Sequence, residues 1–299
     1  MLKDYLIEIF EPTLLFGLLC SSVGLFAAVY FKVFNLYLGL IAILGVIIVQ
    51  IAVNLIDDYV DYDIGIDKET KKTKFSGGSS LVVDKKVTTK NILIIAIIAL
   101  LISGLLGLYI IEFLNSYVIN FIILSMIFGF IATVFYARYL THVPYFAEPF
   151  VSLSFAYVGL AVFIVATNNF FNSLELFFFV FIPSGMQVGV AMIANELPDR
   201  KIDKKYGRRN TVIMFSNYKK SGILYIIYYL IVYSLIFIGM ISGVLPLTFL
   251  ITLLVLPGIY KVWKGINNYK NPESHEKIMG INAITAFLFI ALLSLSFIV

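Results

Sequence analysis

The amino-acid sequence predicts an all-α, polytopic membrane protein in which nine transmembrane helices form a bundle around a central cavity. Hydrophobic residues make up 61% of the 299 residues and charged residues only 13%, whereas soluble chains carry about 25% charged residues. Apolar runs of about 20 residues, the length of a transmembrane helix, recur along the whole chain. These runs are continuous and do not alternate with polar residues, which disfavours a transmembrane β-barrel.

Nine apolar runs divide the chain, and each is expected to form one helix. They cover residues 12–31, 34–56, 91–111, 117–137, 148–168, 174–195, 221–243, 246–263 and 280–298. The first begins at Pro12, and proline favours the first turn of a helix. This run is too long for a signal-peptide core and has no convincing cleavage site, so we expect it to stay in the bundle. The single cysteine, Cys20, permits no intramolecular disulfide and is expected to be a packing residue.

The connections between the runs predict how the chain is oriented. The 22 lysine and arginine residues lie almost entirely in the N-terminal segment and in the connections that follow even-numbered runs, with Lys32 on the other side. The positive-inside rule therefore places the N-terminus and these connections in the cytoplasm. We expect a multi-pass protein of the cytoplasmic membrane, surrounded by lipid. The net charge of +4 then reflects topology and does not indicate nucleic-acid binding.

The chain as a whole, residues 1–299, is expected to form a single membrane domain. Two cytoplasmic loops are long, at about residues 57–90 and 196–220, and they hold most of the charge. The other connections are short. Polar loops on a rigid helical scaffold are where function tends to concentrate.

Two acidic clusters stand where the second and sixth runs end, at the edge of the predicted hydrocarbon layer. They consist of Asn54, Asp57, Asp58 and Asp61, and of Asn195, Asp199 and Asp203. On a helix each set lies on one face, because its members are three or four residues apart. Carboxylates this close repel one another unless a cation lies among them. At the membrane boundary such acids indicate function by default.

Mg²⁺ is the cation that this pattern favours, because it takes oxygen ligands from one or two carboxylates together with phosphate oxygens and water. Two clusters facing each other across the cavity would hold two or more Mg²⁺ ions against one diphosphate. The nearby basic residues expected to bind that diphosphate are Lys68, Lys74, Arg200, Arg208 and Arg209. A solvated helix end would explain one such cluster equally well, but two clusters of similar pattern favour the metal site.

Two longer motifs carry a resemblance to a known family. The first acidic cluster continues into Gly65-Ile66-Asp67 and then Phe75-Ser76-Gly77-Gly78-Ser79. The second reads Asn195-Glu196-x-Pro198-Asp199-x-x-x-Asp203-x-x-x-Gly207-Arg208-Arg209-x-Thr211. Both resemble the UbiA superfamily of membrane-embedded aromatic prenyltransferases, and most closely the branch of 1,4-dihydroxy-2-naphthoate prenyltransferases, which would place the chain in quinone biosynthesis. The resemblance covers essentially the whole chain and implies a nine-helix bundle, Mg²⁺ dependence and prenyl transfer from a prenyl diphosphate.

The sequence departs from the family pattern at a few positions. The third aspartate of the common first motif falls on Gly65, so Asp63 or Asp67 must substitute for it. Glu11-Pro12 stands where many members have Arg-Pro, and Arg208 stands where lysine is usual. These departures bear on the acceptor and on individual ligands more than on the reaction.

The reaction implied is ionisation of the donor to an allylic carbocation, followed by its capture by an acceptor, most simply an aromatic ring. Asp58, Asp61, Asp199 and Asp203 would act through the metal. Aromatic faces stabilise a carbocation, and the tyrosines near the cytoplasmic ends of the runs are Tyr59, Tyr62, Tyr136 and Tyr139; an interfacial aromatic belt is the alternative for each. Glu148, at the start of the fifth run, is a candidate base for the acceptor proton, or else a partner of the helix dipole.

The sequence is also compatible with two other functions. The acceptor could be a glycerol phosphate, as in archaeal-type ether-lipid synthesis, which needs no aromatic ring. An ion-coupled transporter is an alternative from another class, but transporter acids usually lie near the membrane midplane. Here they lie at one face, which favours the enzyme. The Asp-Asp-x-x-Asp pattern at residues 57–61 also occurs in soluble prenyl synthases, but those enzymes are not membrane bundles.

Overall fold

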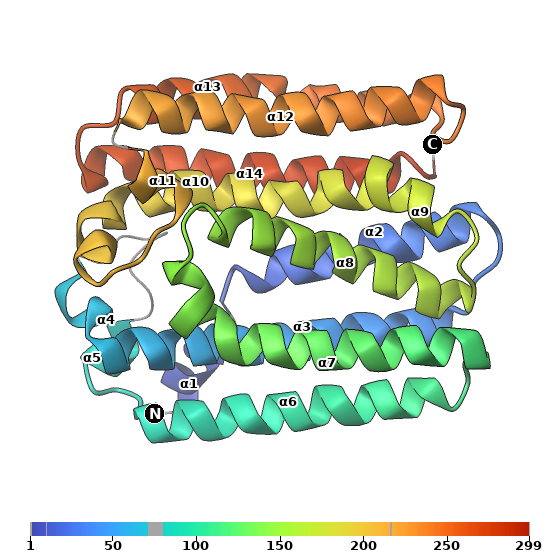
Figure 1. Cartoon of the computed structure of the whole chain (residues 1–299), viewed down its shortest axis with the longest axis horizontal. Helices are drawn as coiled ribbons and strands as arrows, with labels where there is room; N and C mark the ends of the chain where they lie inside the picture. Colours follow the sequence, from blue (N-terminus) through green and yellow to red (C-terminus); the bar gives the residue numbers. More distant parts are fainter. Residues whose placement is uncertain (1, 10, 71–79, 216, 299) are drawn as a thin grey trace.

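The chain folds as a bundle of long helices that lie side by side (Figure 1). The computed structural model describes residues 2–9, 11–70, 80–215 and 217–298, and in these segments all regular secondary structure is helical. The long helices are α2 (Leu14–Tyr30), α3 (Leu36–Ile64), α6 (Thr89–Ile111), α7 (Ser116–Tyr139), α8 (Ala147–Thr167), α10 (Ile182–Lys205), α12 (Tyr218–Ile241), α13 (Leu256–Asn267) and α14 (Pro272–Leu295). The prediction of an all-α membrane protein is confirmed.

The nine predicted runs each correspond to one of these helices within the described segments. Eight of these helices are long and apolar enough to cross a membrane. Some of the eight spans include short helical turns next to the main helix. Examples are α9 (Ser173–Leu176) with a π-helical turn before α10, and the 3₁₀ segment Leu247–Val255 before α13. The remaining helix, α2, is apolar but has 17 residues. It is therefore about 26 Å long, close to the minimum for a span.

Side-chain caps mark where several of the helices begin. The Asn35 side chain accepts a hydrogen bond from the Leu38 backbone N–H at the start of α3. The Thr88 side chain accepts one from the Asn91 backbone N–H at the start of α6. Asn271 and Ser274 form a capping box at the start of α14. Such caps satisfy backbone N–H groups that have no partner within the helix. These side-chain caps therefore help to set where α3, α6 and α14 begin.

Two helices extend well beyond the predicted runs. The second run was expected to end near residue 56 and the sixth near 195, but α3 continues to Ile64 and α10 to Lys205. The acidic clusters therefore lie on helices and not on loops. Gly65 ends α3 with a φ of 96°, a conformation that glycine adopts readily. The chain then enters the short helix α4 (Ile66–Glu69).

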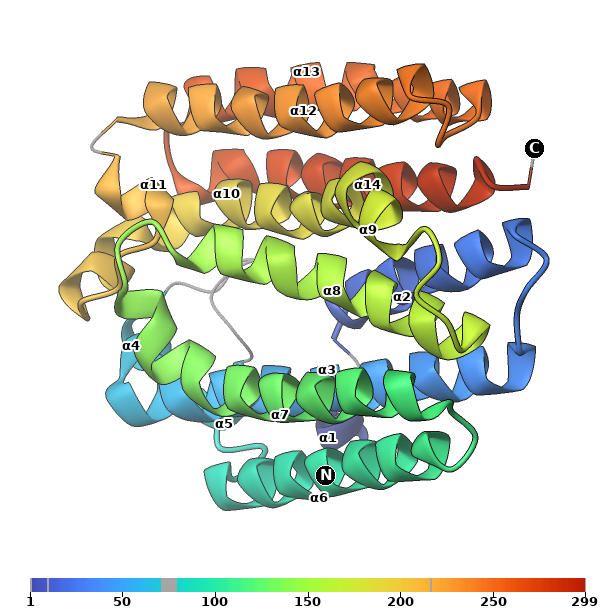
Figure 2. The same ribbon diagram turned by 45° about the vertical axis from the view of Figure 1, so that its right-hand side comes forward.

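The bundle has two packed parts joined by α2 and α8. On one side α3 lies with α6 and α7, and on the other α10 lies with α12, α13 and α14 (Figures 1 and 2). The short helices α4, α5 (Ser80–Val83) and α11 (Thr211–Met214) gather at one end, at the left in both views. The acid-bearing ends of α3 and α10 are therefore close together. That this end faces the cytoplasm stays a prediction.

Close packing of α8 against α10 sets the distance between the two parts. A Cβ atom at Gly185 would overlap the backbone carbonyl oxygen of Ser152 and the backbone of Ala156. Membrane helices use such small residues to bring backbones together. The contact lies in the first turn of α10, and it fixes how α8 packs along the helix that carries the second acidic cluster.

Replacing Gly185 by alanine is therefore expected to lower the free energy of unfolding by about 1–3 kcal/mol, since overpacking forces the two helices apart. Thermal unfolding of the detergent-purified protein would measure the change. Gly104→Ala is the matched control, because a Cβ there meets no atom within 4 Å. An equal effect of the two substitutions would contradict this account of the α8–α10 contact.

Candidate functional site

One polar cavity of about 230 Å³ lies between the ends of α3 and α10. From α3 come Asp57, Asp58 and Asp61, and from α10 come Asn195, Glu196, Asp199 and Asp203. The spacing of three or four residues puts each set on one helix face, as the sequence predicts. The structure thus brings six of the seven predicted metal ligands to a single cavity. The seventh, Asn54, lies outside its lining, and its amide donates to the Thr13 hydroxyl at 2.8 Å.

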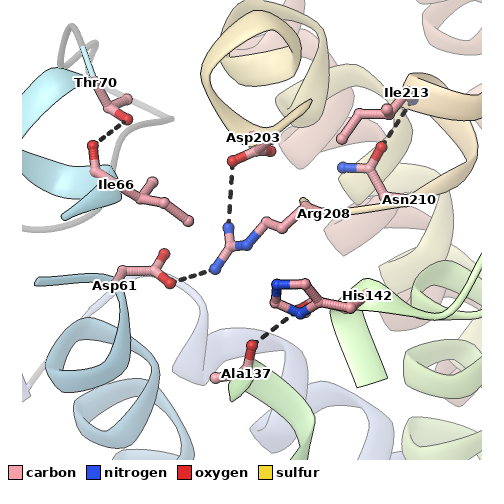
Figure 3. A network of polar contacts seen from close by, with 10 residues as sticks. Asp61, Ile66, Thr70, Ala137, His142, Asp203, Arg208, Asn210 and Ile213 are labelled. Carbon is pink, nitrogen blue, oxygen red and sulfur yellow. Dashed lines mark hydrogen bonds and ion pairs between the residues drawn. The ribbon is translucent and has the colours of Figure 1, made fainter. Parts of the chain in front are cut away.

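Arg208 lies between the two acidic faces. Its guanidinium donates through Nη2 to Oδ1 of Asp61 and through Nη1 to Oδ1 of Asp203, the latter at 3.5 Å (Figure 3). Burial opposes the charge, but the carboxylates of Asp61 and Asp203 hold the pKa of Arg208 above its ordinary value. The arginine therefore stays charged and links α3 to α10 across the cavity.

The short helix α4 closes the side of the cavity next to α3. Asp67 is buried and lines the cavity, whereas Asp63 is exposed and pairs with Arg138 at 3.1 Å. At the end of α4, the Glu69 carboxylate accepts hydrogen bonds from Lys205 Nζ at 2.6 Å and from the Tyr206 hydroxyl at 2.9 Å. Of the two aspartates considered for the third position of the first motif, the structure places Asp67 at the cavity.

The other predicted diphosphate-binding residues lie outside the cavity lining. Lys68 Nζ stands 4.3 Å from the centre of the Tyr62 ring. Arg200 Nη2 donates to the Phe215 carbonyl oxygen at 2.9 Å. Arg209 is exposed, and Lys74 falls outside the described residues. Within the segments that the structure describes, Arg208 is thus the predicted basic ligand that the fold brings to the acidic residues.

Of the four tyrosines predicted to line the carbocation, one lines the cavity and three lie outside it. Tyr136 lines the cavity and stacks on Phe150, with ring centroids 5.9 Å apart and an interplanar angle of 14°. Tyr59 and Tyr62 instead pack against the apolar cluster between α3 and α6. Tyr139 is 55% exposed. Only a ring that faces the cavity can contact a substrate there, so the geometry favours Tyr136 among the four.

Glu148 is fully buried at the start of α8 and anchors the segment that carries Arg208. Its Oε1 accepts a hydrogen bond from the Thr211 backbone N–H and its Oε2 accepts one from the Thr211 hydroxyl, both at 2.7 Å. These bonds tie α8 to the first turn of α11. Sequence reasoning did not assign a role to Glu196, which lines the cavity beside Glu148. Its position next to Asn195 in the second motif was the feature of the sequence that could have indicated a place in the cavity.

Glu148→Gln separates an anchoring role from a role as base. Gln keeps the shape but replaces one acceptor by a donor, so we expect the free energy of unfolding to fall by about 1–3 kcal/mol. Thr211→Val should have a similar effect, and the double variant should lose less than the sum. Thermal unfolding would measure all three, with the exposed Glu112→Gln as control. Lost turnover at unchanged stability would indicate a base instead.

The cavity residues suit a hard divalent cation such as Mg²⁺. The polar lining of the cavity offers carboxylate and amide oxygens and contains no histidine or cysteine. The Oδ1 atom of Asn195 and the Oε2 atom of Glu196 are buried without a hydrogen-bond partner in the described segments. No three acidic, histidine or cysteine side chains in these segments already form a metal-ligating group. Mg²⁺ commonly binds proteins through one or two carboxylates and takes its further ligands from substrate phosphates and water.

Comparisons of the sequence and of the fold with known proteins point to the same family. The model of the UbiA prenyltransferase family matches residues 15–295. A UbiA homologue from Aeropyrum pernix K1 in the apo state has a TM-score of 0.72 at 14% identity, over 95% of this chain and 97% of that one. A UbiA homologue from Archaeoglobus fulgidus bound to DMAPP and Mg²⁺ has a TM-score of 0.61 at 17% identity, over 98% and 99%.

A third similar structure is described as a digeranylgeranylglyceryl phosphate synthase. Its TM-score is 0.59 at 18% identity, over 99% of this chain and 98% of that one. No curated protein sequence matches the chain. At these identities the solved structures establish a shared fold.

Proposed function

The chain belongs to the UbiA prenyltransferase family, and we propose that it transfers a prenyl group from a prenyl diphosphate to an aromatic acceptor in an Mg²⁺-dependent reaction. As a member of this family it is an enzyme that transfers prenyl groups, so the alternative of an ion-coupled transporter is set aside. The observation that carries the proposal is the meeting of two acidic helix faces and one arginine in a single cavity.

The carboxylates of α3 and α10 would hold the metal, with Asp58 and Asp61 opposite Asp199 and Asp203. Mg²⁺ bound there would stabilise negative charge on the diphosphate as the C1–O bond breaks. Arg208 lies within reach of the same region and can bind diphosphate oxygens in a bidentate manner. Two acidic faces would allow one diphosphate to be held through metal ions from both sides of the cavity.

Tyr136 would face the reacting carbon, because it is the one of the four candidate tyrosines that lines the cavity. An allylic carbocation is attracted to the face of a tyrosine ring, and the stacked Phe150 keeps that ring in place. The carbocation also has to be kept from water. Ile66, Ala147 and Met192 supply an apolar part of the cavity wall.

The acceptor is proposed to be an aromatic ring of the kind found in quinone precursors, because the two long motifs resemble those of 1,4-dihydroxy-2-naphthoate prenyltransferases. A glycerol phosphate acceptor is the second candidate, because a structure of similar fold is described as a digeranylgeranylglyceryl phosphate synthase. Either acceptor would meet the donor at the cavity. We propose that this end of the bundle faces the cytoplasm, where soluble diphosphates and acceptors are made.

Pyrophosphate release from the detergent-purified protein tests the proposal. The protein would be given geranylgeranyl diphosphate and Mg²⁺, alone and with a panel of aromatic and glycerol phosphate acceptors. Release that requires Mg²⁺ and an aromatic acceptor is expected. Release with the glycerol phosphate acceptor alone would replace the first acceptor by the second. No release from folded protein with any donor would contradict the proposed reaction.

A further inference from the structure

Arg208 contacts two carboxylates that a bound metal ion would also need. It lies against Asp61 of α3 and Asp203 of α10, and the three side chains are 15%, 12% and 5% exposed. The same two carboxylates are among the expected Mg²⁺ ligands. A guanidinium that contacts both acidic faces therefore competes with a metal ion for the same two carboxylates.

The backbone around Arg208 holds this side chain in the cavity. Gly207 has a φ of 85° and turns the chain after α10, and the Arg208 N–H then donates to the Asp203 carbonyl oxygen at 3.0 Å. The next residue, Arg209, donates its N–H to the Thr141 carbonyl oxygen at 2.9 Å. The guanidinium is thus positioned by the fold and is not a surface charge that happens to point inwards.

Charge explains why this contact forms. The cavity lining contains seven acidic side chains, namely Asp57, Asp58, Asp61, Asp67, Glu196, Asp199 and Asp203, and Arg208 is the basic residue in that lining. Carboxylates brought together in a poorly solvated place repel one another, and a cation among them removes part of that cost. A guanidinium and a divalent cation compete for these carboxylates, because each is stabilised by the same negative charge and the two cations repel one another at close range.

We propose that Arg208 is an exchangeable counter-ion, which bridges Asp61 and Asp203 when no metal is bound and passes to the donor diphosphate when Mg²⁺ takes these carboxylates. This inference rests on the proposed function, because the same carboxylates serve as metal ligands. It has a direct consequence for binding order. Metal alone has to displace the arginine and binds weakly, whereas metal together with diphosphate offers the arginine a new anionic partner and binds tightly.

Mn²⁺ binding to the detergent-purified full chain tests the exchange, because Mn²⁺ takes oxygen ligands as Mg²⁺ does and its free form is measured by electron paramagnetic resonance. In Arg208→Gln, the carboxylates lose their competing cation. We expect Mn²⁺ alone to bind this variant on the order of tenfold more tightly than wild type, equivalent to about 1.4 kcal/mol. Inorganic pyrophosphate should tighten Mn²⁺ binding in wild type and much less in the variant, after the Mn²⁺ that pyrophosphate itself binds is subtracted with a protein-free sample.

Two further variants keep the test decisive. Lys201→Gln is the matched control, because this basic side chain is exposed and outside the cavity, and the variant should bind Mn²⁺ as wild type does. Arg208→Lys serves if the glutamine variant is not folded without metal. The ammonium group lacks the planar guanidinium fork that spans the two carboxylates, so this variant should also bind Mn²⁺ more tightly than wild type.

The possible outcomes separate this inference from the proposed function. Unchanged or weaker Mn²⁺ binding by the Arg208 variants would overturn the exchange while leaving metal-dependent catalysis intact. Absence of Mn²⁺ binding by wild type, even with pyrophosphate present, would count against the proposed function itself. Thermal unfolding adds a second readout: removing metal with EDTA should destabilise Arg208→Gln more than wild type, and Mn²⁺ should restore the difference.

Discussion

Replacing Asp58 or Asp199 by asparagine is expected to lower prenyl transfer by a factor of about 100 or more while the protein still folds. Asp58 lies on α3 and Asp199 on α10, and both line the cavity. Asparagine keeps the size of the side chain but removes its charge, so the metal and the charge that develops on pyrophosphate lose one partner. Losing one such electrostatic contact costs about 10²–10³ in kcat in well-studied enzymes.

Turnover with geranylgeranyl diphosphate, and thermal unfolding of the same samples, would test this expectation. Asp84→Asn is a suitable control, since Asp84 is exposed and pairs with Lys86 at 3.3 Å on the surface. Turnover at the wild-type rate in Asp58→Asn or in Asp199→Asn would contradict a site built from both helices. A loss of turnover that merely follows a loss of folding would leave the two acids as structural residues.

The double variant Asp58→Asn/Asp199→Asn adds information about how the two faces act. If both hold metal ions against the same diphosphate, each single substitution already disrupts the shared assembly. The double variant should then be little worse than either single variant, as for groups that act as a unit. Losses that multiply would instead indicate two independent sites.

Much of the fold could be predicted from the sequence, because each span is long and apolar on its own. The acidic spacing also placed Asp57, Asp58 and Asp61 on one face without any knowledge of their neighbours. The helix ends were harder to predict. Hydropathy detects where the apolar residues of α3 stop, near residue 56, but the helix itself ends at Gly65, where backbone conformation changes. A polar sequence that continues a helix outside the membrane carries no hydropathy signal.

The partners of individual side chains could not be predicted, because they depend on contacts between distant segments. Arg208 meets Asp61 across 147 residues of sequence, and Thr211 meets Glu148 across 63. Tyr59 resembles Tyr136 in its position near a helix end, yet only Tyr136 lines the cavity. Orientation around the helix axis decides between them, and that is set by which helices pack together.

The third position of the first acidic motif provides the second large effect. Asp67→Asn is expected to lower turnover by a factor on the order of 100, whereas Asp63→Asn should leave it within about twofold of wild type, since surface ion pairs contribute little. The reason is placement. Gly65 turns the chain so that α4 presents Asp67 to the cavity, while Asp63 stays exposed beside Arg138.

Because the two aspartates are four residues apart and flank the same glycine, each substitution is the matched control for the other. Turnover measured at several Mg²⁺ concentrations would distinguish a ligand from a packing residue. If Asp67 helps to hold the metal, Asp67→Asn should need more Mg²⁺ for half-maximal rate, whereas a packing defect lowers the rate equally at every concentration. The reverse pattern, with Asp63→Asn inactive and Asp67→Asn active, would mean that α4 turns its other face to the substrate in the working enzyme.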